Sequence, residues 1–142
     1  MRKTIYLLLT FAMFACVSFA QEAKQGARIV FKEIIKDLGE FPESEPTATC
    51  VFEFTNEGDA PLVIHRAQAS CGCTVPKYPK EPVMPGEKGT VTVSYNGAGK
   101  HPGPFKKSIR LMTNANPEMA IIYVKGKMTE VGVGKDKTML DR

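Results

Sequence analysis

The sequence predicts an all-β fold, an antiparallel β-sandwich. Apolar and polar residues alternate along several short runs, as half-buried strands require. Turn-forming residues separate these runs at intervals of roughly ten residues, a spacing typical of sandwiches. Ten prolines, twelve glycines and the lack of a long helix-favouring run agree with this prediction.

The first twenty residues have the features of an export signal. The basic pair Arg2-Lys3 precedes an uncharged apolar run over residues 5–17, and the small residue Ala20 ends the segment. The run is too short to favour a transmembrane anchor, and no later stretch approaches ~20 apolar residues. We therefore predict a signal peptide over residues 1–20, cleavage after Ala20, and a periplasmic or secreted protein.

An alternative interpretation makes Cys16 a lipid-attachment site. Met13 and Phe14 are poor matches to the leucine and small residues that usually precede such a cysteine, and an apolar stretch follows it. We therefore do not expect a lipoprotein.

The exported part of the chain is large enough for one domain, burying roughly two-thirds of its unfolded surface. Without Arg2 and Lys3 the 19 basic residues fall to 17, against 15 acidic residues, a net charge of +2. This near-neutrality gives no electrostatic case for nucleic acid. We predict one domain over residues 21–128 and a flexible tail over 129–142, where few side chains could be buried.

Each strand is predicted from its own alternation. Residues 48–55 place Cys50, Phe52 and Phe54 on one face, and residues 89–95 alternate in the same way. The remaining strands are predicted over residues 61–68, 105–112 and 119–127, the last apolar on both faces at its start and so suited to a central or covered position. The turns between them are Asn56–Asp59, Pro85-Gly86, Asn96-Gly97 and Asn114–Pro117.

Residues 28–35 fit two structures. From Phe31 to Leu38 the apolar residues follow the i, i+3, i+4, i+7 spacing of a helix. The β-branched content and the break at Gly39 favour an edge strand instead, and we predict a strand.

The segments "FTNEG", "SCGCTVPKYP" and "PGEKG", with a later "TN", resemble the DUF1573 family of exported bacterial proteins over roughly residues 29–128. The resemblance implies an immunoglobulin-like sandwich of about seven strands, of the PapD/ASPM-SPD-2-Hydin type. The Ala20-Gln21 junction is also similar to Bacteroidetes signal-peptide sites. The family has no assigned function, so the resemblance implies a fold and a compartment but no activity.

Three cysteines remain after export, Cys50, Cys71 and Cys73, and an odd number leaves at least one thiol unpaired within the monomer. If consecutive strands run up and down, all three cluster at one end of the sandwich. The strand over residues 105–112 has no cysteine, which excludes the antibody-type bridge.

Three roles stay open for these cysteines. Cys50 could pair with Cys71 or Cys73, closing a loop worth ~3 kcal/mol, or remain a buried free thiol in its strand. Cys71 and Cys73 could instead pair with each other, because Gly72 tolerates unusual torsions, and cycle with an exported thiol oxidoreductase. As thiolates they could hold Cu(I) or Zn(II), with His101 or Cys50 as the third ligand.

No catalytic constellation, nucleotide-binding motif or cofactor site is recognisable, so we do not expect an enzyme or a cofactor. We predict a binding module whose partner is another protein or a cell-envelope component, contacted through loops at the end of the sandwich or through an exposed strand edge, with one loop preferred. The residues of that loop are Ser70, Gly72, Thr74, Lys77 and Tyr78. The competing classes are a thiol-based redox or metal-binding protein and a structural envelope subunit. The sequence predicts neither a ligand nor an oligomeric state.

Overall fold

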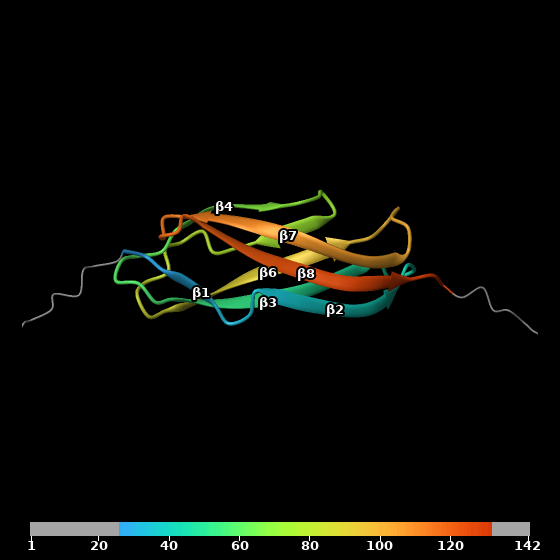
Figure 1. The fold of residues 1–142 in the computed structure, drawn as a ribbon, viewed down its shortest axis with the longest axis horizontal. Coiled ribbons are helices and arrows are strands. Elements are labelled where there is room, and N and C mark those ends of the chain that lie inside the picture. Colours follow the sequence, from blue (N-terminus) through green and yellow to red (C-terminus); the bar gives the residue numbers. More distant parts are fainter. Residues whose placement is uncertain (1–25, 132–142) are drawn as a thin grey trace, which may run out of the picture.

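A computed structural model describes residues 26–131, which form eight strands in two facing sheets (Figure 1). The order is β1-β3-β6-β5 in the first sheet and β2-β8-β7-β4 in the second. The predicted sandwich is confirmed. The strands are β1 (Ile29–Phe31), β2 (Ile35–Pro42), β3 (Thr47–Asn56), β4 (Ile64–Ala69), β5 (Thr74–Lys77), β6 (Lys88–Asn96), β7 (Gly103–Thr113) and β8 (Met119–Thr129).

The predicted signal peptide over residues 1–20 and most of the predicted tail over 129–142 lie outside the described residues. Within residues 26–131, no helix has the length and apolar character needed to cross a membrane.

The core lies between the two central strand pairs. In the first sheet β3 and β6 are antiparallel, with Phe52 opposite Val91, and both side chains are fully buried. In the second sheet β7 and β8 are antiparallel, with Ile109 opposite Ile122, again fully buried. The alternation predicted for these strands is confirmed, because the apolar face of each sheet packs against the other.

The segment predicted as one strand over residues 28–35 is in fact two strands in different sheets. β1 pairs antiparallel with β3, whereas β2 pairs parallel with β8. The sandwich is therefore not antiparallel throughout. The chain crosses between the sheets at residues 32–34, and this change of sheet shifts the inward-facing positions, which produced the helix-like spacing in the sequence.

The segment between β5 and β6 crosses the side of the sandwich where β4 and β5 are the edge strands. β4 begins at Ile64 rather than at residue 61. Leu62 does not pair with β7 and instead forms an isolated bridge with Val83. Both main-chain hydrogen bonds of this bridge measure 2.9 Å. β5 (Thr74–Lys77) is an additional short strand that follows β4.

Asn56, at the end of β3, is a fully buried polar residue that connects the loops at one end of the sandwich. Its Oδ1 accepts hydrogen bonds from the main-chain N–H groups of Arg28 (3.2 Å) and Gly58 (3.0 Å). Its Nδ2 donates to the carbonyls of Ala60 (2.8 Å) and Val83 (2.9 Å). The amide thus uses its full hydrogen-bonding capacity, which offsets the cost of burying it.

Replacing Asn56 with alanine should lower the free energy of unfolding by about 3 kcal/mol, because one buried and three half-buried main-chain groups lose their partner. Asn114 provides a matched control. It makes the same kind of contacts, to Val63 N–H and Pro61 C=O, but it is exposed. Asn114→Ala should cost about 1 kcal/mol, since water can replace the lost bonds. Urea unfolding of both variants measures the difference, and equal losses would show that burial of the Asn56 amide is unimportant.

Candidate functional site

The two predicted site cysteines lie where the chain passes from one sheet to the other. Residues 70–78 are here called the cysteine corner. They comprise the turn over residues 70–73, β5 and Tyr78, and the turn joins β4, an edge strand of the second sheet, to β5, an edge strand of the first. Cys71 and Cys73 are joined by a disulfide, with their Cα atoms 5.3 Å apart. The Thr74 N–H donates to Cys71 C=O (3.3 Å), which closes the turn around Gly72.

The corner is hydrogen-bonded to both sheets. Ser70 N–H donates to Ser108 C=O on β7 (2.9 Å), and Ser108 N–H donates back to Ser70 Oγ (3.3 Å). On the other side, Asn96 N–H at the end of β6 donates to Cys73 C=O (2.7 Å). Main-chain hydrogen bonds and a covalent bridge together fix the corner in one conformation.

The tip of the corner is accessible to solvent. Gly72 is exposed and both cysteines are half-buried, whereas Thr74 is buried beneath them. The Thr74 hydroxyl lies 3.6 Å from Cys71 Sγ and 3.9 Å from Cys73 Sγ. A buried hydroxyl therefore lies close to both sulfur atoms, and both cysteines remain partly exposed.

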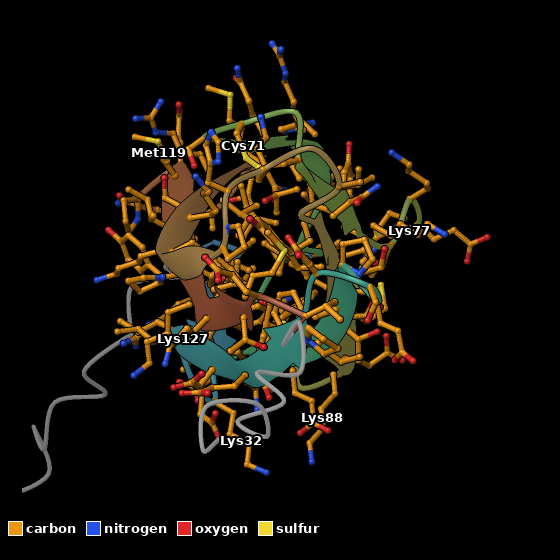
Figure 2. The ribbon with its side chains drawn as sticks, turned by 90° about the vertical axis from the view of Figure 1, so that its right-hand side faces the viewer. Lys32, Cys71, Lys77, Lys88, Met119 and Lys127 are labelled. Atoms are coloured by element: carbon orange, nitrogen blue, oxygen red, sulfur yellow. A yellow bond between two sulfur atoms is a disulfide. The ribbon has the colours of Figure 1, made fainter. Side chains whose placement is uncertain are left out.

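The remaining predicted loop residues have different environments. Lys77 is exposed, and its side chain lies well apart from Cys71 in Figure 2. Tyr78 instead packs against the core, donates a hydrogen bond to the carbonyl of His65 (3.4 Å) and carries Lys80 Nζ 3.8 Å above its ring. Tyr78 therefore holds the corner against the core, and little of its side chain is available to a partner. Sequence reasoning missed Val75, whose side chain on β5 is 56% exposed.

Cys50 lies toward the same end of the sandwich as the corner, since Cys50 and Pro76 are both opposite Val93, but it does not join Cys71 and Cys73 in one site. Cys50 lies on β3 opposite Val93, and β6 separates its strand from β5 and the corner. Its thiol is free and half-buried, so the alternative bridge to Cys50 is not formed. Burial raises the pKa of the Cys50 thiol, and the positive charge of Lys36 offsets part of this rise. The prediction assumed only that consecutive strands alternate in direction. That alternation does not say which strands are hydrogen-bonded neighbours, and β6 lies between β3 and β5.

The predicted third metal ligands are not brought to Cys71 and Cys73. His101 is exposed in the loop before β7, and Cys50 is on a different strand. Over the described part of the chain, no three histidine, cysteine or carboxylate side chains are close enough to share a metal ion.

Comparison with known proteins identifies a protein family and several structures with a similar fold. A protein family described as "Protein of unknown function (DUF1573)" matches residues 29–128. A protein of unknown function from Porphyromonas gingivalis W83 is similar in structure, with a TM-score of 0.63 and 18% identity over 76% of this chain and 50% of that one. This chain spans about half of that protein.

Two further solved structures are similar at lower identity. The PapD-like domain 7 of human CEP192 has a TM-score of 0.60 and 8% identity, over 82% of this chain and 95% of that domain. The VesB protease of Vibrio cholerae has a TM-score of 0.53 and 15% identity, over 72% of this chain and 31% of the protease. No curated protein matches the chain in sequence. At these identities the similarities describe the fold alone, and they confirm the predicted immunoglobulin-like, PapD-like sandwich.

Alkylation of residues 21–142 should distinguish the three cysteines. Without reductant only Cys50 should react, and slowly at neutral pH, because a raised pKa leaves less of the reactive thiolate. Its rate should rise with pH over a higher range than that of glutathione, the control thiol. Intact mass should show one adduct in the unfolded chain and three after reduction. Three adducts without reductant would mean that Cys71 and Cys73 are free.

Proposed function

The chain belongs to the DUF1573 family, whose function is unknown, and we propose that it is an exported, non-enzymatic binding module that uses the cysteine corner to contact a protein or another cell-envelope component. The observation that carries the proposal is a solvent-facing loop held rigid by a disulfide and by hydrogen bonds to both sheets. Ordering a loop on binding costs affinity, and a loop ordered in advance avoids that cost. Loops fixed on a rigid scaffold are common binding sites.

The surface chemistry of the corner supports a protein partner with apolar and acidic groups. Val75 exposes an aliphatic side chain next to the positive charge of Lys77, and neither Lys77 nor Lys80 forms an ion pair within residues 26–131. The export part of the proposal rests on residues 1–20, with their basic start and apolar run. The non-enzymatic part rests on the sequence, which has no catalytic motif to which an acid, base or nucleophile role could be assigned.

A photo-crosslinking residue at Gly72 tests the corner in the cells that make the protein. We expect one discrete crosslinked product, and we expect Lys77→Glu to reduce it by about tenfold or more, because the substitution reverses the charge at the interface. The matched control carries the crosslinker at Thr49, an exposed position on the outer face of β3. Crosslinking from Thr49 with none from Gly72 would place the binding surface elsewhere.

A second candidate function is thiol–disulfide exchange, favoured by a disulfide between two partly exposed cysteines beside the Thr74 hydroxyl. A thiolate of an exported dithiol protein would attack one sulfur of the Cys71–Cys73 bridge, and the other sulfur would leave as a thiolate and take up a proton. The second thiol of the partner would then release the corner as a dithiol. The partner would end as a disulfide, so two electrons and two protons move to the corner.

The double variant Cys71→Ser/Cys73→Ser separates these two functions. A binding module should keep its crosslinked partner, with some loss of stability, whereas an exchange protein should lose its partner while remaining folded. Thermal unfolding followed by circular dichroism checks the fold.

A further inference from the structure

An apolar groove lies away from the cysteine corner, between β1 and the first residues of β8. Its volume is about 430 Å³. β1 and β5 are the two opposite edges of the first sheet, so the groove and the corner are separate surfaces (Figure 1). Three of its side chains are unusually exposed for apolar residues: Ile34 (54%), Met119 (47%) and Ile121 (37%). The sequence predicted a central or covered position for this strand. β8 is central in its sheet, between β2 and β7, but side chains at its start are exposed.

On one side of the groove, β8 has a free main-chain edge. β2 pairs with β8 only from Tyr123 onward, where Tyr123 N–H donates to Ile34 C=O (2.7 Å). Main-chain groups of alternate residues point to the same side of a strand. The N–H and C=O groups of Met119 and Ile121 therefore point to the side where the described residues provide no strand.

On the other side, β1 also has an edge that no strand of residues 26–131 covers. Lys32 N–H donates to Glu53 C=O (3.0 Å) and Glu57 N–H donates to Arg28 C=O (2.9 Å), so the even-numbered residues of this segment face β3. The main-chain groups of Ile29 and Phe31 consequently point away from β3, on the side of the strand that borders the groove. An unpaired edge next to apolar side chains is a template for another strand.

The ends of the groove limit what can enter. The chain crossing at residues 32–34 closes one end, and a hydrogen bond from Asn116 N–H to Ala27 C=O (3.4 Å) narrows the other. Three residues of β1 and three of β8 remain accessible in between. The site therefore suits a short extended segment rather than a long strand.

We propose that this groove binds a short extended segment of a partner protein by strand addition. The free N–H and C=O groups require an occupant with a repeating donor and acceptor backbone, and the apolar walls require apolar side chains at alternate positions. Arg28 lines the groove and Arg110 lies beside Ile121 on β7. Neither arginine forms an ion pair within residues 26–131, so acidic residues flanking the apolar ones complete the match.

A blocked heptapeptide, Glu-Val-Thr-Val-Thr-Val-Glu, tests this site on residues 21–142. In NMR titrations we expect saturable shifts of the amides of Ile29, Phe31, Met119 and Ile121, and slower hydrogen exchange at Met119 and Ile121. The same peptide with its central valine N-methylated should bind at least about tenfold more weakly, because it lacks a backbone donor. No saturable shift at millimolar peptide, or equal binding of the N-methylated peptide, would overturn strand addition.

A variant pair locates the binding. Ile121→Glu should weaken the peptide by about tenfold or more by adding an acid next to the acidic flanks, whereas Val51→Glu places the same charge on an exposed aliphatic position of β3 and should leave binding unchanged. Circular dichroism confirms that both fold. Equal affinities, or shifts confined to residues 74–77, would overturn the groove. Dimerisation abolished by Ile121→Glu would show that a second copy occupies it. None of these outcomes depends on the cysteine corner, so failure of one proposal leaves the other intact.

Discussion

The hydrogen bonds of Asn56 hold together one whole end of this sandwich. Its side chain connects the segment before β1, the turn after β3 and the crossover that carries Val83. Its main chain adds two bonds, donating to Glu87 C=O (3.0 Å) and accepting from Gly86 N–H (2.7 Å). A buried amide that loses a single hydrogen-bond partner lowers the stability of the fold. These segments must therefore adopt their positions together. The direction of β1, and with it the shape of the apolar groove, depends on this residue.

The sequence was sufficient wherever one face of a strand is buried along its whole length. Phe52, Phe54, Val91 and Val93 alternate with polar residues because each belongs to one sheet with one inner face. It was insufficient at residues 32–34, where the chain leaves one sheet for the other and no local pattern marks the change. The pairing of Cys71 with Cys73 rather than with Cys50 was also beyond it, because pairing depends on which strands are neighbours.

The two proposed surfaces differ in how the fold prepares them. The cysteine corner is fixed, since a covalent bridge and bonds from Ser108 and Asn96 leave it little freedom. The groove is incomplete, since a chain that divides its first strand between two sheets cannot pair either part along its full edge. A fixed loop selects a partner by shape, whereas an incomplete edge selects any segment with the right backbone and side-chain period. The two proposals thus assign two different modes of recognition to one small domain.

The parallel pairing of β2 with β8 also determines how the domain bears load. Pulling the two ends of the chain apart draws β2 and β8 past each other lengthwise, so their hydrogen bonds are strained simultaneously rather than opened one at a time. Ion pairs from Lys125 to Asp37 and from Lys127 to Glu40, each 3.2 Å long, span the same two strands, and the bulge at Gly39 keeps both acids aligned with their lysines. Resistance to a force applied in this direction would therefore depend on the rate at which this strand pair ruptures rather than on equilibrium stability.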